Sequence, residues 1–433
     1  MNKKSIIAVI FVLAAMLSFT DNSFAQKKKK SKDEFSAQAK SGVIPAWEKG
    51  YLDIHFISTN TGESTFIIMP DGTQMLVDMA GVVQSPDAAM YMPPLPDGSR
   101  RPGEWITRYI SRCMQWTGND MIDYVSVTHF HGDHIGSNHE SIPMSQNGDY
   151  KLISFAEILD RNKVGMLVDR GWPDYDFPKM LRKSKSLVHY LNCVDYHVAN
   201  GLKVEKFRPG YADQFILKYD SPAFPDFKIQ NIAVNGEVWT GEGNQTKCAF
   251  PDKSTFVGNG ASKDHSPSEN AVSSVFKMSY GAFDYYAGGD VTHNGMSYYE
   301  WKDVEKPVAD AVGQVEVMKA NHHGSSDSNN KYFVKTLSPQ AVVVNVWRDV
   351  QPKGGVAKYI VPDVNEGMAD IFTTSLDLKL EEKMGSAAAR ILSKEGHVLV
   401  RVNPGGASYY IYSLSDRDES MRINERFGPY KSR

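Results

Sequence analysis

One short stretch holds the residues best suited to chemistry: His129, His131, Asp133 and His134 place three imidazoles and one carboxylate within six positions. Imidazole nitrogen and carboxylate oxygen are the usual ligands of a catalytic zinc ion, which keeps one position open for water. Only 12 histidines occur in the 433 residues, so a cluster this dense rarely arises by chance. We therefore expect this stretch to bind divalent metal.

The elements that must position this cluster follow a layered α/β pattern. A buried-type strand predicted over 122–127 ends directly before the cluster, so a strand-end loop would direct alternate histidines to one ion and the other two residues to a second. Batches of strands separated by helices favour α/β layers. The other predicted strands are 52–57, 64–69, 74–78, 214–217, 227–229, 271–278, 283–287, 315–319, 341–346, 397–402 and 407–414. Helices are predicted over 103–116 and 180–187, and a long surface loop over 241–268.

The N-terminus has the pattern of a secretory signal peptide over residues 1–25. Lys3 and Lys4 precede an apolar run, 6–19, and small residues at Ser23 and Ala25 fit a cleavage site. The run is shorter than the roughly 20 apolar residues of a membrane span, although an uncleaved anchor is the alternative. We expect an exported protein, periplasmic or extracellular, without a membrane span after cleavage, and a flexible charged leader over 26–50.

The composition gives no strong sign of a nucleic-acid-binding protein or of a cysteine-based site. The net charge of -3 gives no strong nucleic-acid signal, because such proteins usually carry a basic balance. The three cysteines, Cys113, Cys193 and Cys248, lack the spacing of a disulfide framework or a thiolate zinc site, so we expect small core residues and leave their disulfide state open. The oligomeric state also stays open.

Four segments in a fixed order resemble the metallo-β-lactamase superfamily. The stretch 128–136 (THFHGDHIG) resembles its hallmark motif, and 274–290, which ends in YYAGGD, is similar to its strand–hairpin–GD element. The stretch 318–325 (MKANHHGS) is similar to its strand–HHGS element, and 70–78 to its first hairpin, whose aspartate supports the metal ligands. The HHGS variant is similar to the branch that contains the hydrolase domain of the competence protein ComEC and the phosphorylcholine esterases.

This resemblance implies a four-layer αββα sandwich over 51–415, with an insertion over about 137–265 as a substrate wall and a C-terminal tail over 416–433. It also implies two divalent metal ions, with zinc the expected metal. The implied catalytic residues are Asp133, Asp290 and His322, and which of His322 and His323 binds metal stays open. The implied ligands are His129 and His131 for the first ion, Asp133, His134 and His323 for the second, and Asp290 bridging both.

The resemblance also implies a reaction, in which a metal-bound hydroxide attacks a phosphodiester or related phosphorylated substrate, small or polymeric. The alternatives are hydrolysis of a carbonyl substrate (a lactone, thioester or β-lactam) and a non-catalytic metal-binding module. Two features depart from the family pattern. The turn at 58–63 is altered, and no residue clearly fits the family's further histidine on the first metal. His139, His189, His197 and His265 have no motif support for that role.

Overall fold

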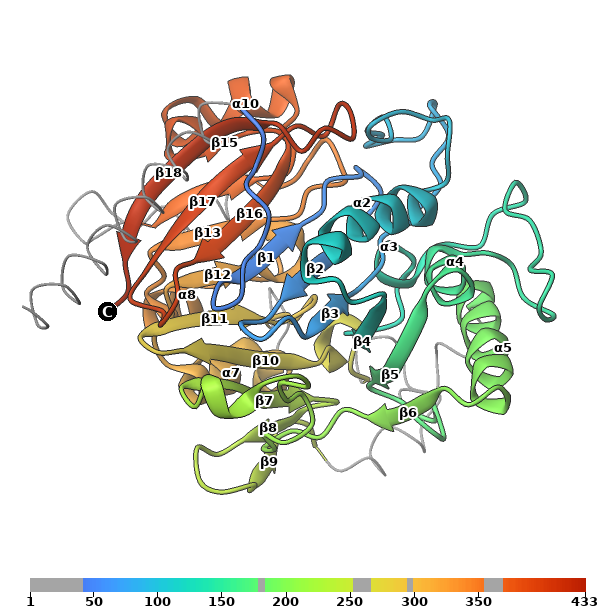
Figure 1. Ribbon diagram of the computed structural model, residues 1–433, viewed down its shortest axis with the longest axis horizontal. Coiled ribbons are helices and arrows are strands. Elements are labelled where there is room, and N and C mark those ends of the chain that lie inside the picture. Colours follow the sequence, from blue (N-terminus) through green and yellow to red (C-terminus); the bar gives the residue numbers. More distant parts are fainter. Residues whose placement is uncertain (1–41, 178–183, 252–265, 294–298, 354–368) are drawn as a thin grey trace, which may run out of the picture.

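The computed structural model describes residues 42–177, 184–251, 266–293, 299–353 and 369–433. Within these ranges the strands form two mixed sheets of nine strands each (Figure 1). In spatial order, the first sheet contains β18 (Ile423–Lys431), β17 (Ser408–Leu414), β16 (His397–Val402), β1 (Leu52–Phe56), β2 (Thr65–Ile68), β3 (Gln74–Val77), β4 (Met121–Ser126), β5 (Lys163–Asp169) and β6 (Lys203–Lys206). The second contains β15 (Ile391–Ser393), β14 (Asp370–Thr373), β13 (Ala341–Val344), β12 (Val317–Lys319), β11 (Phe283–Ala287), β10 (Val275–Tyr280), β7 (Phe227–Val234), β8 (Glu237–Trp239) and β9 (Thr246–Cys248).

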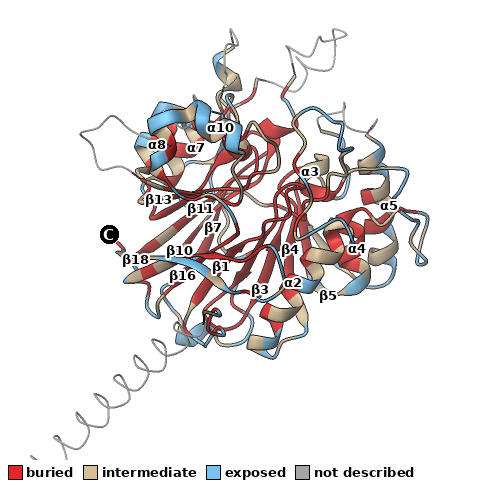
Figure 2. Ribbon diagram, turned by 90° about the horizontal axis from the view of Figure 1, so that it is seen from above, coloured by how far each residue is buried: buried red, intermediate tan, exposed pale blue. Residues whose placement is uncertain are grey.

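Helices cover the outer faces of this two-sheet sandwich, and the strands between them are the most buried part of the molecule (Figure 2). The helices α2 (Pro102–Thr117), α4 (Ser154–Arg161) and α5 (Lys185–Ala199) pack on the first sheet. The helices α7 (Glu305–Val312) and α8 (Lys331–Leu337) pack on the second, and α10 (Leu378–Met384) lies near them. Apolar side chains from both sheets, such as Phe56 and Tyr285, meet in one core between them.

The sequence of α2 shows why these elements form where they do. Pro102 occupies the first helical turn, and the Glu104 carboxylate accepts a hydrogen bond from the backbone nitrogen of Arg101, which completes the N-terminal cap. Buried Ile106 and Ile110, one turn apart, face the sheet. The helix ends at Gly118, whose φ of 72° suits glycine.

The predicted α/β class is confirmed, and most predicted strands lie within two or three residues of observed ones. The strand predicted over 214–217 is wrong. A side chain takes the place of a strand partner at Ile216, because the Tyr124 hydroxyl donates to the Ile216 carbonyl at 3.0 Å and accepts from the Ile216 nitrogen at 3.1 Å. The segment is a loop that buries Phe215 and Leu217.

Three predicted boundaries also differ from the structure. The supposed insertion at 137–265 supplies β5 and β6 to the first sheet and β7, β8 and β9 to the second, so its described part belongs to the sandwich. The supposed tail contains β18, paired with β17, and the supposed leader has a packed end in which Ile44 and Trp47 are buried. The predicted signal peptide lies outside the described residues, as does the first half of the helix predicted over 180–187, whose last residues begin α5.

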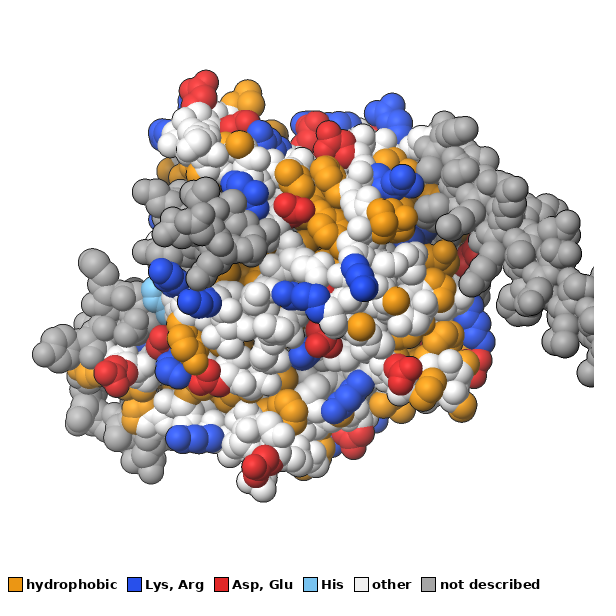
Figure 3. Space-filling model, turned by 90° about the vertical axis from the view of Figure 1, so that its left-hand side faces the viewer, with side chains coloured by type: hydrophobic (Ala, Val, Ile, Leu, Met, Phe, Trp, Pro, Cys, Tyr) orange, Lys and Arg blue, Asp and Glu red, His pale blue; other side chains and the backbone are white. Residues whose placement is uncertain are grey.

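Figure 3 shows one face of the molecule, on which cationic and anionic side chains are interspersed. In the part of the chain that is described, helices with the length and apolarity to cross a membrane are absent. Cys113 on α2 and Cys193 on α5 are buried, as expected, whereas Cys248 on the edge strand β9 is exposed.

Candidate metal centre

The histidine cluster lies where the first sheet meets the second at the ends of their strands. The chain leaves β4 at Ser126 and reaches the cluster through Thr128, and the short helix α3 (Gly132–Ile135) holds its second half. The loops after β11 and β12, which pair in parallel in the second sheet, carry Asp290 and His323. Strand ends of both sheets therefore bring segments more than 150 residues apart into one site.

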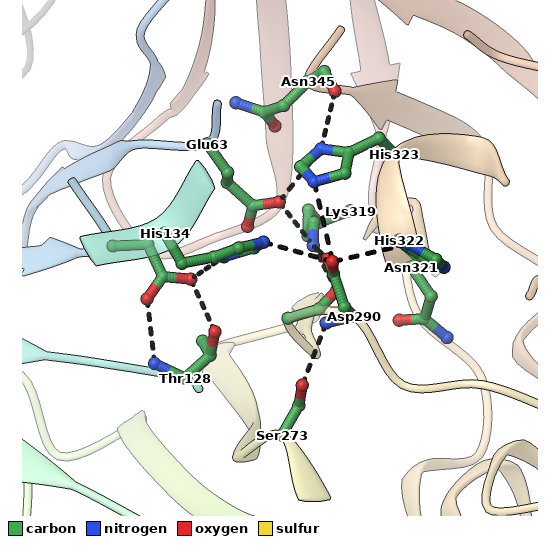
Figure 4. A network of polar contacts seen from close by, with 12 residues as sticks. Glu63, Thr128, His134, Ser273, Asp290, Lys319, Asn321, His322, His323 and Asn345 are labelled. Carbon is green, nitrogen blue, oxygen red and sulfur yellow. Dashed lines mark hydrogen bonds and ion pairs between the residues drawn. The ribbon is translucent and has the colours of Figure 1, made fainter. Parts of the chain in front are cut away.

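Asp78, directly after β3, orients the cluster from behind. Its carboxylate accepts hydrogen bonds from the Thr128 nitrogen at 2.8 Å and the Thr128 hydroxyl at 2.6 Å, and it contacts His134 Nδ1 at 2.8 Å. With Nδ1 held in this way, His134 directs Nε2 toward Asp290 (Figure 4). The supporting role that the resemblance implied for Asp78 agrees with this geometry.

A first group of possible ligand atoms belongs to His129, His131 and Asp290, which lie within 4.8 Å of one another. His129 Nε2 is 3.1 Å from His131 Nδ1 and 3.7 Å from Asp290 Oδ2. The other nitrogen of His129 lies 3.2 Å from the Thr128 hydroxyl, which fixes the ring. These are the residues that the sequence placed on the first ion.

A second group of possible ligand atoms, from Glu63, His134, Asp290 and His323, shares the same aspartate (Figure 4). His134 Nε2 and His323 Nε2 lie 3.2 Å and 3.6 Å from Asp290 Oδ2, and His323 Nε2 is 3.1 Å from Asp133 Oδ2. His323 Nδ1 is 3.0 Å from the Asn345 carbonyl oxygen, the position of a donated hydrogen bond, so Nε2 is the nitrogen left to bind. Asp133 is not a member of this group but adjoins it through His323, so the residues that the sequence placed on the second ion lie close together.

His322 points differently from His323. Its Nδ1 contacts Asp327 at 2.7 Å, its Nε2 lies 3.2 Å from the Asn270 amide nitrogen, and it is 3.9 Å from Asp290. Both histidines have left-handed backbone, with φ of 46° and 53°, and such strain in non-glycine residues is typical of functional sites. The geometry favours His323 over His322 as the ligand.

Unpartnered polar atoms show that these residues fit a metal ion. His134 Nε2 and both carboxylate oxygens of Asp290 are buried and lack a hydrogen bond of acceptable geometry, although they are close enough to count as an ion pair. Such atoms are costly in a folded protein unless something else satisfies them. A bound cation between the imidazoles and the shared carboxylate would do so, and the nitrogen and oxygen donors suit zinc.

The electrostatics of the centre agree with this. Burial lowers the pKa of His129 well below its usual value, with the neighbouring His134 adding to the shift, so the ring stays neutral. Burial opposes the charged forms of Asp290 and His134, but their attraction prevails, which lowers the pKa of Asp290 and raises that of His134. Without a cation, His134 holds a proton that a bound metal ion would displace.

Two buried residues of the centre were not predicted. Lys319 Nζ pairs with Glu63 Oε2 at 2.7 Å, lies 4.0 Å from Asp290 Oδ1 and also donates to the Gly289 carbonyl. Glu63 stands close enough to count among the possible ligands, but Lys319 already neutralises it. The sequence does contain two signals for this pair: Glu63 is an acidic residue in the altered 58–63 turn, and Lys319 ends an apolar strand. A charged residue that is buried needs a partner of opposite charge.

Of the four histidines without motif support for the first metal, the three that are described lie outside this centre. His139 contacts Ser141 on a loop, and His189 Nδ1 accepts from the Lys151 nitrogen; His265 lies outside the described residues. His197 forms a third possible ligand group with Asp160 and Cys193.

That third group already satisfies its own polar atoms. The Asp160 carboxylate accepts from the hydroxyls of Ser145 at 2.6 Å and Tyr150 at 2.7 Å, and it contacts His197 Nε2 at 2.9 Å. Every oxygen of Asp160 thus has a partner, in contrast with the orphaned oxygens of Asp290. We interpret this group as a structural network between α4 and α5.

Comparison with known proteins adds no family. No protein-family model matches the chain, and the search of curated proteins finds no match. The superfamily resemblance therefore stays a prediction, and any statement of function depends on the site.

Proposed function

We propose that this protein is an exported, dinuclear metal-dependent hydrolase with the metallo-β-lactamase fold, and that it cleaves a phosphodiester or related phosphorylated compound. The observation that carries the proposal is the shared aspartate: two groups of ligand-type side chains meet at Asp290, whose buried oxygens lack hydrogen bonds. The helix-covered two-sheet sandwich and the order of the motifs support the fold assignment.

In this proposal each ligand keeps the place that its geometry suggests. His129 and His131 would hold one ion, Asp133, His134 and His323 the other, and Asp290 both. Divalent ions bound there would supply an activated water at neutral pH and polarise the phosphoryl oxygen. Zinc is the proposed metal, because the donors are imidazole and carboxylate.

The other residues would orient and protect the reacting groups. Asp133 is partly exposed, with 13% of its side chain accessible, so its carboxylate can accept a hydrogen bond from the attacking water. Asp327 fixes one nitrogen of His322 and leaves the other near Asp290, where the ring could exchange a proton with the leaving oxygen. Asp78 and Asn345 keep the rings of His134 and His323 turned inward.

A neighbouring cavity favours an anionic substrate over a neutral one. A pocket of about 290 Å³ is lined by Asn60 and Thr61, from the turn that leads to Glu63, and by Arg100 and Arg101. Arg101 is paired with Glu157, whereas the Arg100 guanidinium lies over the Trp105 ring, 5.4 Å from its centre. Glu104 also lines this pocket and pairs with Arg101, so Arg100 is the cationic group there that suits a phosphate group.

The test combines metal analysis with three substrates. Purified protein loaded with zinc should turn over bis-p-nitrophenyl phosphate or p-nitrophenyl phosphorylcholine, and His131→Ala should abolish that turnover. His189→Ala, which changes a histidine outside the centre, is the matched control and should retain activity. Nitrocefin turnover with inert phosphodiesters would favour the carbonyl-substrate alternative, and a metal-binding protein inert toward all three would favour the non-catalytic module.

A further inference from the structure

One short segment, 269–274, contacts all three loops that carry the proposed ligands. The amide nitrogen of Asn270 lies 3.2 Å from His322 Nε2, in the loop after β12. The Ser273 hydroxyl accepts a hydrogen bond from the backbone nitrogen of Asp290 at 3.1 Å, in the loop after β11. The segment therefore fixes both ligand loops of the second sheet relative to one another.

The same segment reaches across to the histidine cluster of the first sheet. The Ser274 nitrogen donates to the Thr128 carbonyl at 3.0 Å, just before the cluster. The Glu269 carboxylate accepts from the backbone nitrogen of Phe130 at 2.8 Å. Phe130 stands between the two histidines of the first group, so Glu269 holds the peptide that spaces them.

Glu269 is itself held by a buried arginine. Arg170, at the end of β5, donates through Nε to Glu269 Oε1 at 2.8 Å and makes a second contact with Oε2. Its guanidinium also lies 4.4 Å from the centre of the Phe130 ring and donates to the Phe177 carbonyl at 2.6 Å. The side chains of Arg170 and Glu269 are only 2% and 3% exposed.

A buried ion pair of this kind is a poor source of stability, because removing two charges from water costs about as much as their attraction returns. Its geometry suggests another role. The first group offers two histidines and shares Asp290, without the further histidine of the family pattern, so its affinity depends strongly on how His129 and His131 are spaced. Partners that orient metal ligands typically change metal affinity by about 10- to 100-fold.

We propose that the Arg170–Glu269 ion pair is a positioning device for the His129–His131 half of the centre. This inference rests on the proposed metal site. Neither residue touches the ligand atoms; both act through the backbone and ring of Phe130. The second half, around His134 and His323, is held by other partners and does not depend on the pair.

The chain offers a matched control in a second buried ion pair. Arg401 binds both carboxylate oxygens of Asp53, at 2.8 Å and 2.6 Å, and these side chains are 2% and 0% exposed. Glu269→Gln should weaken one of two cobalt or zinc binding steps by about 10- to 100-fold and leave the other unchanged. Asp53→Asn should leave both steps unchanged, whatever stability it loses. Isothermal titration and the cobalt absorption spectrum would resolve the two steps.

A second measurement does not need metal. Hydrogen–deuterium exchange in the metal-free protein should rise at the backbone amides of residues 129–131 in Glu269→Gln and not in Asp53→Asn. If Glu269→Gln does not fold, Arg170→Lys, which keeps the charge but loses the two-point contact, should show the same changes at smaller size. Two unchanged binding steps with unchanged exchange would overturn the inference. If the wild type binds no metal but exchange still rises in Glu269→Gln, the proposed function is overturned. In that case the ion pair still positions the peptide around Phe130.

Discussion

At the scale of single residues, the centre is unusual in burying both signs of charge with few hydrogen bonds between them. Imidazoles such as that of His134 lie near Asp290 Oδ2, Lys319 lies near Oδ1, and Glu63 shares the lysine. Burying such groups is favourable only while every partner is present. Two predictions follow from individual side chains of this kind.

Lys319→Met should destabilise the metal-free protein by about 3–5 kcal/mol, because it leaves Glu63 buried without its cation. The double variant Glu63→Gln with Lys319→Met should recover part of that loss, because neither charge then remains. Chemical denaturation of the wild type, both single variants and the double variant gives the coupling energy. If the stability losses of the two single variants simply add up in the double variant, Glu63 and Lys319 do not stabilise each other.

His397, the first residue of β16, predicts an acid-dependent loss of stability. Burial lowers its pKa to about 3, with the neighbouring His55 and Arg112 adding to the shift, and its Nδ1 accepts from the Ser58 nitrogen at 2.9 Å. Unfolded histidine titrates near pH ~6.5, so the unfolded chain binds the extra proton first as the pH falls. Stability attributable to His397 is therefore lost between pH 6.5 and about 3.

His397→Gln keeps an acceptor for Ser58 but does not titrate. Between pH 7 and 4.5, its free energy of unfolding should fall by about 2 kcal/mol less than that of the wild type. Urea unfolding at the two pH values measures the difference, with His139→Gln on a surface loop as the control. An identical pH dependence in wild type and His397→Gln would show that the buried ring is not the acid-sensitive group.

At the scale of elements, the turn that carries His322 and His323 is strained. Its left-handed backbone is held from outside, because the Glu305 carboxylate accepts from the Asn321 amide at 2.9 Å and also receives the backbone nitrogens of Asn329 and Asn330. A left-handed conformation costs a residue with a side chain roughly 1–2 kcal/mol, and glycine does not incur this cost.

His322→Gly should therefore be about 1 kcal/mol more stable than His322→Ala, although both lose the imidazole. The same pair of substitutions at His189, inside helix α5, should give the opposite order, because alanine is favoured over glycine there by about 1 kcal/mol. Denaturant midpoints of the four variants suffice. An equal ranking at both positions would argue against strain at the turn.

The last strand, β18, extends the first sheet and contacts the second. Tyr430 stacks on Tyr409 of β17 with ring centres 5.0 Å apart, and Phe427 lies against Phe372 of β14. Deleting residues 419–433 would uncover these apolar side chains and the edge of β17. We expect the truncated chain to aggregate or to melt well below the full chain, by circular dichroism. A truncated chain with an unchanged melting temperature would show that β18 does not stabilise the fold.

At the scale of the whole molecule, local patterns reveal the strands and the clustered histidines and aspartates but not the contacts that join distant segments. The apolar run before His129 and the motifs at Asp290 and His323 predict strand-end loops, and the structure brings these three residues together at such loops. The pairing of Glu63 with Lys319 joins positions 256 residues apart, and neither has a motif that names its partner. The Arg170–Glu269 contact is invisible for the same reason.

Periodicity also fails where one side chain replaces a strand partner. The 214–217 segment has the residues of a strand, yet the Tyr124 hydroxyl forms hydrogen bonds with the backbone nitrogen and carbonyl of Ile216, where a strand partner would bind. Conversely, β18 alternates poorly in burial, because it is an edge strand with one side open to water, and its pairing with β17 decides its structure. Tertiary contacts settle both cases.

The central claim is that two divalent ions bind on either side of Asp290. Anomalous diffraction from crystals grown with zinc, collected at the zinc absorption edge, tests it most directly. The account predicts two peaks, one against His129 and His131 and the other against His134 and His323, each in contact with the Asp290 carboxylate. A zinc-free centre, or a single ion that leaves Asp290 without a metal contact, would contradict it.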